Sequence, residues 1–295
     1  MLVVGLAIAI LIGVSLGMLG GGGSILTVPL LLYVFGVEAK AAIAMSLLVV
    51  GTTSVAALVP HARAGRVQWK TGAIFGAASM IGAYGAGRVA KFIPSSALLL
   101  AFGAMMLVTA VAMMRPKRAS SAESSAPKTL PLHWILLEGL AVGAVTGLVG
   151  AGGGFLVVPA LALLAGLAMP EAVATSLMVI ALKSFAGFAG YVSTVSINYS
   201  LAAQVIAAAI VGSFIGTSLV SRVHPDSLRK GFGWFIVVMS IFVLGQEIPK
   251  ALGYRVTVVT HAPQLFAAML TPLIIAAIVK KLRAPRASET PATHP

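Results

Sequence analysis

One charged residue, Lys183, stands inside the apolar run Ser176-Leu-Met-Val-Ile-Ala-Leu-Lys-Ser-Phe-Ala-Gly187. If this run crosses a membrane, inserting its ammonium group costs roughly 2.5 to 3.5 kcal/mol, so another group must offset that cost. An anionic substrate would do so, and we expect Lys183 to act as its counter-charge. Two alternatives stay open: the side chain snorkels to the membrane interface, or the lysine is buried in its neutral form.

Two glycine clusters could place backbone N–H groups around such an anion. Glycine weakens a helix and permits conformations that other residues avoid, so a helix is expected to unwind at each cluster. Unwound backbone at membrane depth must be buried in protein or line a wet cavity, and the helix that restarts there points its positive end at the break. The alternative is that the glycines only let helices pack closely. The predicted substrate-binding residues of the two clusters are Gly20, Gly21, Gly22, Gly23, Ser24, Gly150, Gly152, Gly153, Gly154 and Phe155.

Hydroxyl side chains near Lys183 could donate further hydrogen bonds to an oxyanion. The predicted substrate-binding residues of this kind are Ser46, Thr53, Ser176 and Ser184, with Thr52, Ser54 and Thr175 as further candidates. For each of them, a hydrogen bond between helices is the alternative.

Composition indicates which elements must position these residues. The chain of 295 residues is 59% hydrophobic and only 9% charged, a balance typical of a membrane protein rather than a water-soluble domain. Its net charge of +13 comes from Lys and Arg in short segments between apolar runs, which indicates membrane topology rather than nucleic-acid binding. The absence of cysteine excludes disulfides and thiolate metal sites.

The chain also repeats itself with an offset of 130 residues. Gly17-Met-Leu-Gly-Gly-Gly-Gly-Ser-Ile-Leu-Thr-Val-Pro29 aligns without a gap with Gly147-Leu-Val-Gly-Ala-Gly-Gly-Gly-Phe-Leu-Val-Val-Pro159. Over 13–60 against 143–190, 17 of 48 pairs are identical, which far exceeds what the apolar composition alone would give. The repeat mate of Lys183 is Thr53, so the lysine is an addition of the second half.

These observations predict an all-α polytopic membrane protein with two homologous repeats, glycine-broken helices and roughly 8–10 membrane helices. We predict a first repeat over 1–114, a polar linker over 115–130, a second repeat over 131–247, an additional C-terminal helix over 248–283 and a polar tail over 284–295. Within the repeats, apolar helices are expected near 41–60, 70–91, 95–114, 171–192, 200–221 and 227–247, with short segments over 24–36 and 154–166.

The basic loops predict that the two halves are inserted in opposite directions. Arg63, Arg66 and Lys70 occupy a loop whose mate, 193–200, carries no charge. Because Lys and Arg favour the cytoplasmic side, one loop is expected inside and its mate outside.

Other function classes find less support. A membrane-embedded enzyme is one alternative, but His61, His133, His224 and His261 fall near predicted ends or loops, and no deep pair of nucleophile and base emerges, so we predict no catalytic residues. A passive anion channel and a structural subunit of a larger complex also stay open. We expect no cofactor, no metal site and no nucleic-acid partner.

The glycine-rich pattern over residues 13 to 29, its echo over 143 to 159, and the paired Ser46-Leu47 and Thr175-Ser176-Leu177 resemble the sulfite exporter TauE/SafE family of permeases. The resemblance covers most of residues 5 to 280. It implies secondary transport, without ATP, of sulfite, sulfoacetate, thiosulfate or another organosulfonate across the bacterial inner membrane. The expected partners are that anion and the lipid bilayer, and a coupling ion stays open.

Overall fold

The computed structural model describes residues 2–19, 22–114, 132–150, 152–163, 166–219 and 225–252. All its elements are helical, which confirms the predicted all-α class for this part of the chain. The first half contains α1 (Leu2–Leu19), η1 (Gly22–Leu26), α2 (Thr27–Pro29), η2 (Leu30–Val34), α3 (Ala39–Arg63), α4 (Trp69–Val89), η3 (Ala90–Phe92) and α5 (Ser95–Met114). The second half contains α6 (Leu132–Val149), α7 (Gly154–Leu163), α8 (Met169–Tyr191), α9 (Tyr199–Leu219) and α10 (Pro225–Ala251).

Helix boundaries recur with the offset seen in the sequence. Helices α1, α3, α4 and α5 begin at residues 2, 39, 69 and 95, and α6, α8, α9 and α10 begin at 132, 169, 199 and 225. The short segments differ, because the first half uses 3-10, α and π turns over residues 22–34 where the second half forms one helix, α7.

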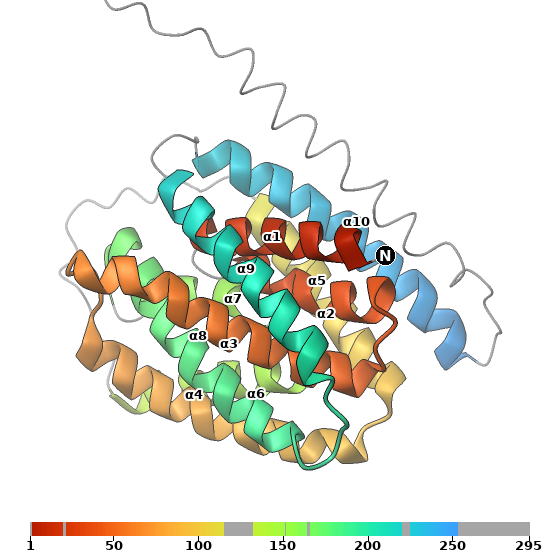
Figure 1. Ribbon diagram of the computed structural model, residues 1–295. Coiled ribbons are helices and arrows are strands. Elements are labelled where there is room, and N and C mark those ends of the chain that lie inside the picture. The colour runs from red at the N-terminus through yellow and green to blue at the C-terminus, as the bar shows by residue number, and fades with distance from the viewer. Residues whose placement is uncertain are drawn as a thin grey trace, which may run out of the picture.

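The helix contacts are also repeated: replacing each helix by its equivalent in the other half turns one contacting pair into another. Helix α1 packs on α9 as α4 packs on α6, and α3 contacts α9 as α8 contacts α4. The pairs α3–α8 and α5–α10 each join a helix to its own equivalent in the other half. In Figure 1, α3 and α8 lie in the middle of the bundle, while α10 and α4 lie on opposite sides. This pairing is what a two-fold relation between the halves would produce, and opposite insertion stays a prediction.

Glycines let two of these helix pairs approach closely. A Cβ atom on Gly13 of α1 would overlap the Ala209 carbonyl of α9, and one on the repeat mate Gly143 would overlap the Ser79 carbonyl of α4. Gly82 and Gly212 meet the partner backbone in the same way. Close packing is therefore the role of these glycines, as is common where small residues line membrane helix interfaces.

The outer surface of the bundle suits a lipid solvent. Among the described residues, three helices are long and apolar enough to cross a membrane: Ala39–Arg63, Met169–Tyr191 and Tyr199–Ser218. Several helices expose large apolar side chains, and examples of these side chains are Ile81, Val211, Phe214 and Ile241. Trp69 and its mate Tyr199 begin α4 and α9 with about half of each side chain exposed, as interfacial anchors do.

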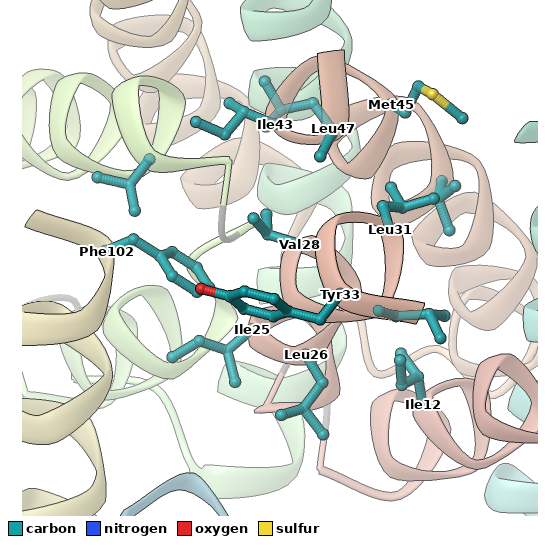
Figure 2. Close-up of a cluster of buried hydrophobic side chains, with 14 of the residues drawn as sticks. Ile12, Ile25, Leu26, Val28, Leu31, Tyr33, Ile43, Met45, Leu47 and Phe102 are labelled. Atoms are coloured by element: carbon teal, nitrogen blue, oxygen red, sulfur yellow. The ribbon is translucent and has the colours of Figure 1, made fainter. Parts of the chain in front are cut away.

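A buried apolar cluster surrounds the short segments of the first half. Figure 2 shows Ile25, Leu26, Val28 and Leu31 packed beside Ile43 and Leu47 of α3 and Phe102 of α5. Tyr33 closes the cluster with an edge-on contact to Phe242 of α10, with ring centroids 5.1 Å apart. The cluster fixes η1, α2 and η2 against α3, which places the first glycine break next to the middle of that helix.

Some predicted segments lie outside the described residues: the linker over 115–130, the C-terminal helix from residue 253 onward, and the tail. Helix α10 extends to Ala251, past the end predicted for the second repeat at 247.

Candidate functional site: the glycine breaks and Lys183

The second glycine cluster breaks the helical path between α6 and α7. Gly150, Gly152 and Gly153 have positive φ angles of 74°, 61° and 63°, a region that residues with a side chain adopt at a cost. The Gly153 carbonyl then accepts hydrogen bonds from the N–H groups of Leu156 and Val157, at 3.0 and 3.1 Å, and starts α7. The first N–H groups of α7, including that of Gly154, have no partner inside their own helix and point toward the break.

The two breaks meet each other. Gly20 and Gly21 lie outside the described residues, while Gly22 and Gly23 begin η1 and lead to Ser24, which is fully buried. A Cβ atom on Gly152 would lie 3.0 Å from Ser24 Oγ and 2.5 Å from Val50 Cγ1 of α3. The structure therefore brings together two clusters that lie 130 residues apart in the sequence.

Ser46 of α3 ties the first half to the second break. Its hydroxyl donates to the Gly150 carbonyl, and it also lies 2.9 Å from the Ile43 carbonyl of its own helix. Because Ser46 is fully buried, this hydrogen bond satisfies a carbonyl that the broken helix leaves open. Ser46 thus makes the kind of hydrogen bond between segments that was the alternative to substrate binding.

Lys183 lies against the same break and is 1% exposed. Its Nζ donates a 2.6 Å hydrogen bond to Thr146 Oγ1 of α6, and a Cβ atom on Gly153 would lie 2.5 Å from that Nζ. Among the described residues, no carboxylate lies within 4.0 Å of the ammonium group. The side chain therefore points into the protein next to the start of α7, and snorkelling to the interface is not its conformation here.

Two positive features converge at this point, and neither is neutralised by a described residue. The ammonium of Lys183 and the N-terminal end of α7 both favour negative charge, and Thr146 supplies only a hydroxyl. The arrangement can bind an anion by a charge contact on one side and backbone N–H donors on the other.

The remaining predicted hydroxyls behave differently from one another. Thr53 Oγ1 donates to the Val49 carbonyl at 2.7 Å, and Ser176 Oγ donates to the Val173 carbonyl at 2.7 Å. Ser184 Oγ is buried and has no hydrogen-bond partner among the described residues. The side chain of Phe155 lies outside what the structure describes.

The site is occluded. Ser24, Ser46, Thr53, Ser176, Lys183 and Ser184 are all 0 or 1% exposed. A pocket elsewhere, between α2, η2, α5 and α10, is lined mainly by apolar side chains, which include Val28, Leu99 and Phe102, and leaves no room for a water molecule. In this conformation Lys183 is closed off from solvent.

Sequence analysis missed Thr146, the hydrogen-bond partner of Lys183. A signal for it was present, because Thr146 replaces Leu16 in the repeat just as Lys183 replaces Thr53. Thr146 adds a hydroxyl where the first half has an apolar side chain, Lys183 puts an amine where the first half has a hydroxyl, and the structure brings the two side chains into contact.

Comparison with known proteins now adds to this geometry. The model of the family described as sulfite exporter TauE/SafE matches residues 5–243. No solved structure gives a significant match.

Several curated relatives are similar over most of their length. A "Probable membrane transporter protein" of Xylella fastidiosa is 33% identical over 239 residues, which cover 79% of this chain and 91% of the relative. One of Methanocaldococcus jannaschii is 30% identical over 81% of this chain and 95% of the relative. The YdhB protein of Bacillus subtilis, also called a probable membrane transporter protein, is 26% identical over 75% of this chain and 91% of its own length.

These names indicate a transporter rather than an enzyme, and the apolar helices agree with a multi-pass membrane protein. The chain, a membrane transporter, belongs to the sulfite exporter TauE/SafE family.

Proposed function

We propose that the protein is a secondary transporter that carries a small sulfur-containing anion, such as sulfite, thiosulfate, sulfoacetate or another organosulfonate, across the bacterial inner membrane. The anion binds between Lys183 and the start of α7, at the point where the two glycine breaks meet. A coupling ion accompanies it.

The observation that carries the proposal is the buried Nζ of Lys183, with Thr146 as its hydrogen-bond partner and no described carboxylate within 4.0 Å. A buried charge without a counter-charge is costly in protein, and a bound anion would remove that cost. The positive end of α7 favours the same charge. The printed name of the family, sulfite exporter, supports the choice of a sulfur oxyanion.

Occlusion of the site supports a carrier rather than an open pore. Lys183, Ser24 and Ser46 are closed off from solvent, so ions cannot pass continuously through this conformation. A carrier that alternates between two access states passes through such an occluded form, with the broken helices moving relative to their neighbours.

The test is uptake of isotope-labelled sulfite or thiosulfate into liposomes that contain the purified protein. We compare the native chain with Lys183→Met and Lys183→Arg, and use Lys70→Met as the control because Lys70 is an exposed lysine at the start of α4. We expect Lys183→Met to abolish uptake, Lys183→Arg to retain part of it, and Lys70→Met to match the native rate.

Unlabelled anion inside the liposomes should accelerate uptake of labelled anion from outside, which is the behaviour of a carrier. Flux that does not respond to internal anion would identify a channel instead. Native transport of sulfur oxyanions that Lys183→Met leaves unchanged would refute the proposed binding site.

A further inference from the structure

Two buried serines, Ser54 of α3 and Ser184 of α8, occupy equivalent positions in the two halves, 130 residues apart. Both are fully buried, and neither hydroxyl has a hydrogen-bond partner among the described residues. An unpaired hydroxyl in the interior loses its hydrogen bonds to water without replacement, so two matching ones call for an explanation.

Other hydroxyls on these helices are paired. Serine and threonine in a helix usually donate to a carbonyl one turn earlier, as Thr53 does to Val49 and Ser176 does to Val173. Ser54 and Ser184 do not use this bond, so their O–H groups are available to another acceptor.

Ser54 lies on the same face of α3 as Ser46 and Val50, and this face runs alongside the second glycine break. Along this face, Ser46 contacts Gly150 and Val50 contacts Gly152, so the contacts advance together along both segments. Since Ser54 is one helical turn beyond Val50, continuing this progression brings it level with the start of α7. That is the end of α7 next to which the Lys183 ammonium lies.

The equivalent face of α8 contains Ser176, Ile180 and Ser184, and Lys183 is the immediate neighbour of Ser184. Helices α3 and α8 contact each other in this region, since a Cβ atom on Gly51 would lie 3.3 Å from the Phe185 ring. The two hydroxyls therefore belong to the same central crossing, one from each half.

We propose that Ser54 and Ser184 are paired oxygen-binding donors of the transported anion, one from each half, and that they select oxyanions over halide ions. The inference rests on the proposed function and deepens it. The ammonium of Lys183 supplies charge, while the two hydroxyls donate to oxygens of the anion that the lysine does not contact.

A site in which Lys183 supplies the charge and two hydroxyls donate hydrogen bonds favours an anion with several acceptor oxygens. Sulfite, thiosulfate and sulfonates carry three oxygens on one sulfur, so different donors can each meet a separate acceptor. A chloride ion is a single small sphere and cannot contact donors that are spread around a larger anion. Selectivity of this kind depends on hydroxyl position, whereas Lys183 attracts any anion.

The experiment measures thermal unfolding of the purified full chain against sodium sulfite, sodium thiosulfate and sodium chloride, for the native protein, Ser54→Ala and Ser184→Ala. The control is Ser79→Ala, because Ser79 of α4 is also fully buried with an unpartnered hydroxyl. A ligand that binds the folded state raises the melting temperature according to its Kd.

We expect the Kd of sulfite to rise about tenfold or more in Ser54→Ala and in Ser184→Ala, since a hydrogen bond to a charged ligand is lost. The Kd of chloride should change less than about twofold, and Ser79→Ala should match the native protein for both anions. Without ligand, both variants should be as stable as the native chain or more so, because each removes an unpaired buried group.

Two results would overturn the inference while leaving the anion site intact: native affinity for sulfite in both variants, or an equal loss for sulfite and chloride. A lower melting temperature of the ligand-free variants would also overturn it, since the hydroxyls would then have protein partners. If no sulfur oxyanion stabilises even the native protein, the proposed function fails, and this inference fails with it.

Discussion

The hydroxyl of Ser46, in the first half, donates a hydrogen bond to the carbonyl of Gly150, in the glycine break of the second half. The second break is therefore stabilised by the first half of the chain. We predict that Ser46→Ala lowers the free energy of unfolding by about 1–2 kcal/mol, because a buried carbonyl loses its donor. Thermal unfolding in detergent measures the change.

The matched control is Ser240→Ala in α10. Ser240 is also fully buried, but among the described residues its hydroxyl bonds only to the Val237 carbonyl of its own helix, at 2.8 Å. The Val237 carbonyl lies inside a helix and keeps its backbone acceptor role when the Ser240 hydroxyl is removed. We therefore expect Ser240→Ala to lower the stability less than Ser46→Ala does. Equal melting temperatures for the two variants would show that the link between the halves contributes little.

Gly153→Ala should abolish transport and destabilise the protein. The added Cβ would lie against Thr146 and 2.5 Å from Lys183 Nζ, at a backbone φ of 63°. The backbone strain alone costs roughly 1–2 kcal/mol, and the clash displaces the lysine. Liposome uptake and thermal unfolding report the two effects separately.

Gly65→Ala separates strain from the clash. Gly65 has a φ of 68° but open space around its Cβ position. We expect it to lose about 1 kcal/mol of stability and to retain transport. Should Gly65→Ala abolish uptake as completely as Gly153→Ala does, contact with Lys183 would not be the cause.

Thr146→Val removes the hydrogen-bond partner of Lys183 while preserving side-chain volume. We predict that the ligand-free variant is about 1–3 kcal/mol less stable, because a buried ammonium loses its acceptor. Added sulfite should restore most of this stability, since the anion supplies new acceptors. The melting temperature at increasing sulfite concentration measures the recovery. A deficit that stays constant at all concentrations would place the anion away from Lys183.

Within α4, two glycines three residues apart should respond in opposite ways. A Cβ on Gly82 would overlap the Leu140 carbonyl of α6, whereas Gly85 has no atom within 4 Å of its Cβ position. We expect Gly82→Ala to destabilise the protein by about 1–3 kcal/mol. Gly85→Ala should be neutral or stabilise it by up to about 1 kcal/mol, since alanine favours helix. Comparable losses at both sites would mean that close helix packing is not the reason for Gly82.

Sequence alone determined the all-helical membrane class, the offset of 130 residues between helix starts, and the positions of the glycine breaks. Apolar run length follows from the thickness of the hydrocarbon layer, and an ungapped repeat follows directly from the residues. The separate role of each glycine was not readable, because Gly13 and Gly82 serve close packing whereas Gly150 and Gly153 serve a positive φ. The residue type is glycine in both cases, and only the surrounding tertiary structure distinguishes the two roles.

The tertiary structure decided which side chains face each other. Lys183 meets Thr146 across 37 residues of sequence, and Ser46 meets Gly150 across 104. Such pairs depend on how α3, α6 and α8 cross, which is set by side-chain packing along the whole bundle rather than by local periodicity. Ser54 and Ser184 have no hydrogen-bond partner among the described residues, whereas Thr53 and Ser176 bond to carbonyls of their own helices, a distinction that residue type could not make.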